Sequence, residues 1–189
     1  VCSSDLWGWL ETTPLADVKR PPNAKARKRG IRQAEIDAIV KELDWEQWLR
    51  AERNSDEVAI AFLLGIETAM RNGEMMSLRW EDVDLKQQVA TVRDTKNGDD
   101  REVPLSTAAV KLLGCLPRES ERCFGITSEV RDVVFRQARN TAGIKDVHFH
   151  DSRSEGISRL SKKFNVLDLA RITGHRDLRS LMQIGRAHV

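Results

Sequence analysis

The stretch that decides the fold runs Phe149-His-Asp-Ser-Arg-Ser-Glu-Gly-Ile-Ser-Arg-Leu160 and resumes as Val166-Leu-Asp-Leu-Ala-Arg-Ile-Thr-Gly-His175. Its apolar spacing predicts one amphipathic helix over 152–164 and a shorter one over 166–173. The second helix should end at Gly174, because glycine adopts the left-handed conformation that closes many helices. The predicted inward residues of the first helix are Ile157, Leu160 and Phe164.

Further helices are predicted on both sides of this stretch. A buried helix is expected over 58–70, which is apolar almost all round, with Asn54 or Ser55 as its cap. Other helices are expected over 107–113, over 128–142 and, with an interruption, over 178–183. An amphipathic helix is also expected after Gly30, with Ile36, Ile39, Val40 and Leu43 on its inward face. The inward residues predicted for the helix over 128–142 are Val130, Val133, Val134 and Ala138.

Two segments, 89–93 and 101–105, have strand character. Asn97-Gly98 lies between them, and both residues tolerate the positive φ that a tight hairpin needs. The sequence therefore predicts a mostly helical α+β fold with one small antiparallel sheet.

Composition excludes several classes of protein. The chain has 189 residues, with 31 Lys and Arg against 29 Asp and Glu, and no apolar run long enough to cross a membrane. No secretion signal is evident, and Cys2, Cys115 and Cys123 form neither an even disulfide framework nor a tight metal-ligand spacing. A cytoplasmic protein is expected. The sequence contains no tyrosine.

Both ends of the chain look foreign to the rest. The peptide over 184–189 and that over 1–5 can be encoded by one DNA string and its reverse complement, a string similar to a sequencing-library adapter. Coincidence between two short peptides is the alternative. We therefore expect residues 1–6 and 184–189 to be adapter translation and the natural protein to lie between them.

The natural chain is expected to begin with Trp7-Gly-Trp-Leu-Glu-Thr-Thr-Pro-Leu15, and a basic segment follows this peptide. Its prolines and glycine indicate an extended linker, which is either a solvated tether or a strap along a phosphate backbone. The basic residues are Lys19, Arg20, Lys25, Arg27, Lys28 and Arg29.

Four places carry more polar chemistry than a core requires. Arg71 follows the buried helix, where it suits a bidentate phosphate contact or a surface ion pair with Glu74. Lys96 lies beside the hairpin turn, where most lysines are merely solvated. The other candidates are His150, Arg153 and His175.

His150 and Arg153 are spaced i, i+3 at a helix start, which favours a phosphate ligand because helix N-termini carry free N–H groups. A capping box formed by Ser152 and Glu155 is the alternative interpretation of the same residues. His148 and His150 lack further ligands at suitable spacing, so no metal site is predicted.

Arginine, lysine, histidine, arginine and histidine follow one another along the chain as Arg71, Lys96, His150, Arg153 and His175. This order resembles that of the tyrosine recombinase family, the phage integrases. The resemblance covers about 24–183 and is strongest from Phe149 to Met182. It implies a catalytic domain over 24–183, preceded over 7–23 by the tail of a core-binding domain and a DNA-wrapping linker. Family members act on double-stranded DNA, assemble on it as tetramers and use no cofactor, metal or small-molecule substrate. A cytoplasmic, nucleoid-associated location follows.

The resemblance also implies a role for each residue. Arg71 and Arg153 would clamp the scissile phosphate, and Lys96 would protonate the departing 5′ oxygen. His150 would assist proton transfer near the nucleophile, and His175 would hydrogen-bond the phosphate. The family's nucleophile forms a 3′-phosphotyrosyl link with the cut strand.

The chain departs from the family pattern at the nucleophile. The tyrosine is expected near Ile184, and neither that position nor any other is tyrosine. Ser154 also replaces the second histidine of many relatives. We therefore expect an inactive fragment of a recombinase. The alternatives are a non-catalytic DNA-binding regulator with the same fold and, more weakly, a metal-dependent phosphodiesterase, which would need ligand clusters that the sequence lacks.

Overall fold

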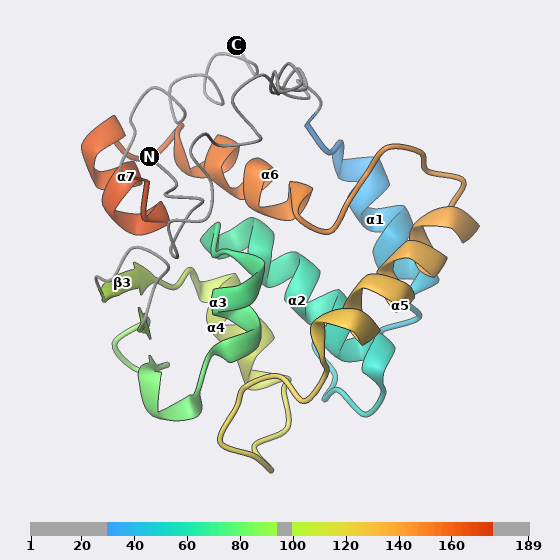
Figure 1. The fold of residues 1–189 in the computed structure, drawn as a ribbon, viewed down its shortest axis with the longest axis horizontal. Coiled ribbons are helices and arrows are strands. Elements are labelled where there is room, and N and C mark those ends of the chain that lie inside the picture. The colour runs from blue at the N-terminus through green and yellow to red at the C-terminus, as the bar shows by residue number, and fades with distance from the viewer. Residues whose placement is uncertain (1–29, 94–99, 176–189) are drawn as a thin grey trace, which may run out of the picture.

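The computed structural model describes residues 30–93 and 100–175, and in this part α2 is the central helix (Figure 1). Helices α3, α4, α5 and α6 all pack against α2, while α7 contacts α6 and the strand β3. The helices are α1 (Gln33–Glu42), α2 (Asn54–Thr68), α3 (Asn72–Ser77), a 3-10 helix η1 (Trp80–Asp82), α4 (Thr107–Gly114), α5 (Ser128–Thr141), α6 (Asp151–Leu160) and α7 (Val166–Thr173). The predicted helix over 178–183 lies outside the described residues.

The sheet has three antiparallel strands in the order β1-β2-β3. They are β1 (Val83–Asp84), β2 (Val89–Val92) and β3 (Arg101–Pro104). Ala90 pairs with Val103, and both are fully buried. The predicted pairing of two strands is confirmed, and the mostly helical α+β class with it, whereas the two-residue β1 was too short to give a sequence signal. Asn97-Gly98 lies outside the described residues.

The start of α2 differs from the prediction of a cap at Asn54 or Ser55. Its cap position is Arg53, and the carboxylate of Asp56 accepts the backbone N–H groups of Glu52 (3.0 Å) and Arg53 (2.9 Å). A carboxylate near a helix N-terminus is stabilised by the free N–H groups and the helix dipole. The helix therefore begins one residue earlier than a side-chain cap at Asn54 would allow.

Two predicted inward residues are wrong. Val133 of α5 is 43% exposed, because α5 turns Arg131, Phe135 and Ala138 inward at i, i+4, i+7. The guanidinium of Arg131 lies over the Phe149 ring, 4.7 Å from its centroid, so a charged residue occupies a core position. Phe164 is 37% exposed because α6 ends at Leu160 and the helical period does not continue.

Helices α2 and α6 come into close backbone contact at Gly156. A Cβ added to Gly156 would lie 2.7 Å from the carbonyl oxygen of Ile66 and 2.8 Å from that of Gly65. Both contacts are with backbone atoms, which cannot rotate away as a side chain can. Glycine at position 156 therefore sets the distance between the two helices whose ends carry the site described below.

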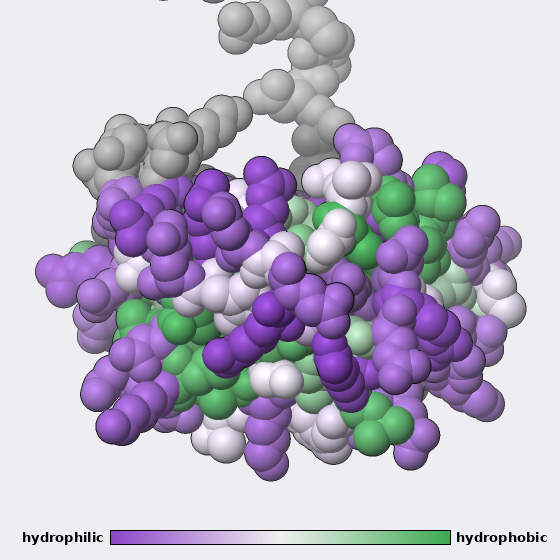
Figure 2. Space-filling model, turned by 90° about the horizontal axis from the view of Figure 1, so that it is seen from below, coloured by the Kyte–Doolittle hydropathy of each residue, from purple (hydrophilic) through white to green (hydrophobic). Residues whose placement is uncertain are grey.

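None of the helices in the described part is long and apolar enough to cross a membrane. One face of the molecule shows hydrophilic side chains between separate hydrophobic groups (Figure 2). The hydrophobic core lies beneath, around the fully buried side chains of Phe62, Ile60 and Leu64 of α2.

Replacing Gly156 by alanine should lower the free energy of unfolding by about 2 kcal/mol, because the new methyl group forces α6 away from α2. Urea denaturation measures the change. Gly114→Ala is the matched control, since a Cβ at that position meets no atom within 4 Å. Equal stability of the two variants would show that the helices do not depend on this close approach.

Candidate functional site

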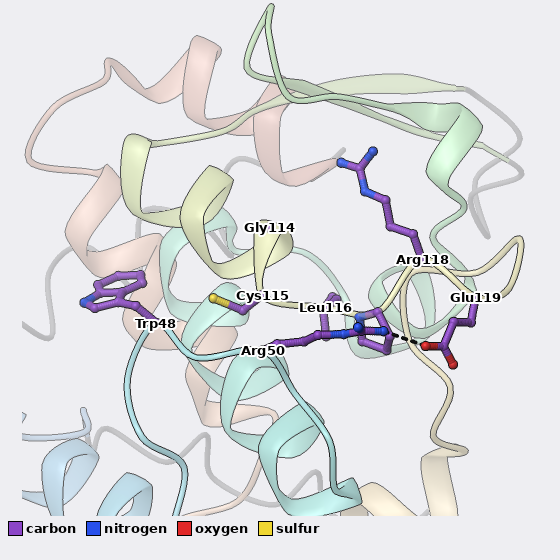
Figure 3. Close-up of a pocket in the computed structure, with 8 residues that line it drawn as sticks. Trp48, Arg50, Gly114, Cys115, Leu116, Arg118 and Glu119 are labelled. Carbon is purple, nitrogen blue, oxygen red and sulfur yellow. Dashed lines mark hydrogen bonds and ion pairs between the residues drawn. The ribbon is translucent and has the colours of Figure 1, made fainter.

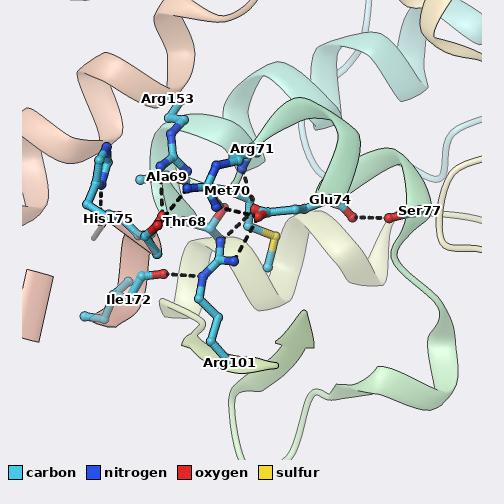
Figure 4. A network of polar contacts seen from close by, with 12 residues as sticks. Thr68, Ala69, Met70, Arg71, Glu74, Ser77, Arg101, Arg153, Ile172 and His175 are labelled. Atoms are coloured by element: carbon cyan, nitrogen blue, oxygen red, sulfur yellow. Dashed lines mark hydrogen bonds and ion pairs between the residues drawn. The ribbon is translucent and has the colours of Figure 1, made fainter. Parts of the chain in front are cut away.

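Three predicted site residues, Arg71, Arg153 and His175, come together where α2 and α7 end and α3 begins (Figure 4). The first and the last of them, Arg71 and His175, are more than a hundred residues apart in the chain. The contact between α6 and α2 and that between α7 and β3 bring these segments into one place.

Arg153 is the most deeply placed of the three, with 5% of its surface exposed. Its Nη1 donates to the carbonyl oxygen of Ala69, at the end of α2, and its Nη2 donates to that of Thr173, at the end of α7 (2.8 Å). The last carbonyls of a helix lack intrahelical partners and carry partial negative charge, so both helix ends stabilise the guanidinium. Burial, opposed by Glu74 and reinforced by Arg71 and Arg101, lowers the pKa of Arg153 to about 10, so the group is charged at neutral pH.

Arg71 occupies the cap position of α3. Its Nη1 donates to Oε1 of Glu74 (2.8 Å), and its Nη2 donates to the carbonyl oxygen of Gly174 (2.7 Å). The ion pair that was the alternative interpretation of Arg71 is therefore present, but it is not a surface pair, because the Glu74 side chain is only 9% exposed. The ion pair therefore lies inside the cluster, and the same guanidinium also reaches the end of α7.

Arg101 belongs to the same cluster and was missed from the sequence. Its Nη1 and Nη2 donate to the two carboxylate oxygens of Glu74 (2.9 and 2.6 Å), and its Nε donates to the carbonyl oxygen of Ile172 (3.0 Å). A basic residue at the start of an exposed-looking strand gave no signal of this role. Only the packing of α7 against β3 places it here.

Glu74 is held as a carboxylate by its two arginine partners. Burial alone would raise the pKa of Glu74, but hydrogen bonds from Arg101 and Arg71 outweigh it and lower the pKa to about 2. Three guanidiniums thus surround one carboxylate, and positive charge remains in excess. Such a site attracts an anion with several oxygen atoms, and phosphate fits this description.

His175 follows Gly174, the left-handed residue that ends α7 as predicted. Its Nδ1 lies 2.7 Å from the hydroxyl oxygen of Thr173. Burial and the nearby charges of Arg153, Arg71 and Arg101 lower the pKa of His175 to about 4. The ring is therefore neutral at pH 7.

Gly174 itself is required for the closeness of the cluster. It has φ +67°, and an added Cβ would lie 3.0 Å from Nη1 of Arg71 and 3.1 Å from Cζ of Arg101. A side chain here would be strained by its backbone and would also press on both guanidiniums.

His150 occupies the cap position of α6 and is exposed, whereas Arg153, three residues later, is buried. The capping box of Ser152 and Glu155 is wrong. The hydroxyl of Ser152 donates to the carbonyl oxygen of Phe149 (2.7 Å), and Glu155 instead accepts from Arg159 (2.9 Å).

Other predicted residues lie outside the described part of the chain: Lys96 and the basic residues Lys19, Arg20, Lys25, Arg27, Lys28 and Arg29. Among residues 30–93 and 100–175, no group of three His, Cys, Asp or Glu side chains is placed to hold a metal ion. A surface hollow elsewhere, lined by Trp48, Cys115 and the Arg50–Glu119 ion pair, contains none of the cluster residues (Figure 3).

The chain is similar in sequence to integrases and recombinases over most of its length. The profile of the phage integrase family matches residues 29–186. A Haemophilus influenzae protein named as an integrase/recombinase is 36% identical over 183 residues, which cover 95% of this chain and 60% of that protein. The shufflon-specific DNA recombinase of Escherichia coli is 36% identical over 178 residues, covering 93% of this chain and 44% of that protein.

A solved structure, the catalytic domain of bacteriophage HP1 integrase, shares the fold with a TM-score of 0.65 and 23% identity. The match covers 84% of this chain and 87% of that domain. This chain thus spans only about half the length of the two sequence relatives but most of an isolated catalytic domain.

Glu74→Gln should lower the free energy of unfolding at neutral pH by about 2 kcal/mol, because two arginines lose their charged partner. The folded-state pKa of Glu74 lies below its ordinary value of 4.5, so its stabilisation is complete above that pH and is lost as the pH falls toward about 2. Urea unfolding of both proteins should therefore show a difference that shrinks over this acid range.

Glu119→Gln is the control for this measurement, because the Glu119 side chain is 78% exposed in its pair with Arg50. A difference between wild type and Glu74→Gln that stays constant down to the acid limit would contradict the charged state of Glu74.

Proposed function

Since the chain belongs to the phage integrase family, the tyrosine recombinases, we propose that it is the phosphate-binding part of a site-specific DNA recombinase catalytic domain. The observation that carries this proposal is the convergence of Arg71, Arg153 and His175 around one positively charged site. The substrate is a phosphodiester of double-stranded DNA, in keeping with the name of the related Escherichia coli DNA recombinase.

Arg71 and Arg153 bind the non-bridging oxygens of the scissile phosphate. A guanidinium has five N–H donors, and within the described residues each of these two arginines commits Nη1 and Nη2 to one acceptor each. Donors therefore remain for an oxyanion. The negative charge that builds on these oxygens in the transition state is stabilised by groups already fixed in place, without a metal ion.

The other site residues act on protons. Lys96 donates a proton to the departing 5′ oxygen, and His150 assists proton transfer at the nucleophile. His175 hydrogen-bonds the phosphate. These roles follow the residue order of the family, and the nearness of His175 to the two arginines supports its part.

The attacking group is a tyrosine hydroxyl that the parent protein carries near position 184. Residues 24–183 form the truncated catalytic domain, 7–23 the end of a core-binding domain and its linker, and the six residues at each end are adapter translation. The linker lysines and arginines contact the DNA backbone. No cofactor takes part, and the full protein assembles as a tetramer on DNA in the cytoplasm, at the nucleoid.

One observation favours a second candidate function: the 189-residue sequence contains no tyrosine. A protein that binds DNA through the same cluster without cutting it would be a regulator. Reading the gene beyond the codon for Gln183 separates the two candidates, because a tyrosine codon within a residue or two is expected of the recombinase only.

We expect the chain to bind duplex DNA, with an affinity that falls steeply as salt rises. Arg71→Gln should weaken binding about tenfold, because a hydrogen-bonded charge on the phosphate is lost. Fluorescence anisotropy with a labelled duplex measures the affinity of each protein for DNA. Arg50→Gln removes the same charge outside the cluster and is the control. Equal effects of the two substitutions would contradict a specific phosphate site.

A suicide DNA substrate, nicked so that cleavage is irreversible, should yield no covalent adduct with this chain. The reason is the missing phenol nucleophile. Denaturing gel electrophoresis detects an adduct. The parent protein, expressed through its native C-terminus, should form one in the presence of EDTA. An adduct with the present chain, or a magnesium requirement in the parent, would overturn the mechanism.

A further inference from the structure

Thr173, the last residue of α7, is fully buried beside His175. Its hydroxyl oxygen lies 2.6 Å from the carbonyl oxygen of Leu169 and 2.7 Å from Nδ1 of His175. Its own carbonyl oxygen accepts Nη2 of Arg153 (2.8 Å). Thr173 thus contacts both the histidine and an arginine of the cluster.

These two short contacts fix where the protons are. The hydroxyl has one proton, and the carbonyl oxygen of Leu169 can only accept a hydrogen bond. If the hydroxyl pointed at His175 instead, two oxygen atoms would face each other at 2.6 Å with no hydrogen between them. The hydroxyl therefore donates to Leu169, and Nδ1 of His175 must donate to the hydroxyl.

This arrangement decides what the rest of the ring can do. A neutral imidazole has only one N–H, so a proton on Nδ1 leaves Nε2 with a lone pair. The non-bridging oxygens of a phosphodiester are also acceptors. A neutral His175 in this tautomer would repel a phosphate oxygen at Nε2 rather than bind it.

We propose that Thr173 is a positioning residue that keeps the proton of neutral His175 on Nδ1, so that His175 hydrogen-bonds the DNA phosphate only after Nε2 takes up a proton. Phosphate binding and proton uptake are then one coupled event. This inference rests on the proposed phosphate-binding function and adds to it a residue and a pH dependence.

The charges around the ring agree with this coupling. Arg153 of α6, Arg71 at the start of α3 and Arg101 of β3 act on His175, and Glu74 of α3 is bonded to two of these arginines. Burial and the three arginines hold the pKa of His175 at about 4 without DNA. A phosphate brings negative charge into the same site and raises the pKa of the ring.

Because the pKa of His175 is higher in the complex, DNA affinity is greatest at low pH and is lost as the pH rises through the pKa of the complex. For one proton the loss approaches tenfold per pH unit, or about 1.4 kcal/mol. Guanidinium groups keep their charge over this pH range, so the arginines of the cluster add no such dependence.

The tautomer can be tested directly in DNA-free wild-type protein. Nitrogen-15 NMR of the histidine rings at neutral pH should show His175 protonated on Nδ1 and not on Nε2. Addition of a duplex of mixed sequence should convert the ring to the doubly protonated form. A free ring protonated on Nε2 would overturn the inference, whatever the DNA affinity.

The role of Thr173 can be tested with two variants. Thr173→Ser keeps the hydroxyl, whereas Thr173→Val keeps the shape and frees Nδ1, so the ring can carry its proton on Nε2 and donate while neutral. Between about pH 5 and about pH 8, wild type and the serine variant should lose affinity for a labelled duplex by up to tenfold per pH unit, and the valine variant by less than about twofold.

His148 and His150 are present in all three proteins, so any pH dependence that they cause is shared and cancels in the comparison. Identical slopes in wild type, serine and valine variants would refute the role of Thr173, as would a wild-type affinity that does not change with pH. If the valine variant does not fold, the tautomer seen in the wild-type NMR spectrum still decides the question.

Failure of this inference is distinguishable from failure of the proposed function. Absence of DNA binding by wild type at low salt and low pH would remove the function itself. DNA binding that depends on Arg71 but not on pH would keep the function and remove only the proton coupling.

Discussion

The site depends on one buried guanidinium that joins the ends of two helices. Arg153 donates to the carbonyl oxygens of Ala69 and Thr173, which close α2 and α7. These carbonyls have no partner inside their own helices, so the arginine and the helix ends satisfy one another. The same contact brings a positive charge, the end of α2 and the residues that precede His175 into one place.

A buried positive charge would be costly without an opposing one. Glu74 supplies it, and its two oxygens are shared between Arg71 and Arg101, while these arginines also donate to the carbonyls of Gly174 and Ile172. The last turn of α7 is therefore held by three guanidiniums from three other segments. We infer that this is why the site can keep excess positive charge in a fixed geometry, ready for an anion.

Close packing allows this geometry to form. Gly156 lets α6 approach the backbone of α2, and Gly174 lets the chain pass against two guanidiniums. Both are positions at which a methyl group would meet atoms of another segment. The cluster thus depends on close backbone approach as much as on charged side chains, and the buried hydroxyl of Thr173 lies against the ring of His175.

Much of this was predictable from the sequence. The periodicity of apolar residues located α1, α2, α4, α5, α6 and α7, and glycine at position 174 marked the end of α7, because these signals arise from local geometry. The residue order that resembles the recombinases identified Arg71, Arg153 and His175, which the structure brings together. Lys96 and the linker residues stay predictions.

Other features could be decided only by tertiary structure. Arg101 and Thr173 carry no local mark of their contacts, since their partners lie on other segments or depend on how the chain turns after α7. Val133 and Phe164 fit a helical period but are exposed, because neighbouring elements and the end of α6 decide which face is covered. The sequence by itself determined the elements and the family, and the turn after Gly174 that sets His175 against Thr173 is local as well. The sharing of Glu74 between Arg71 and Arg101 was decided by tertiary structure, because Arg101 lies on β3 and reaches the carboxylate of α3 only through the packing of the two elements.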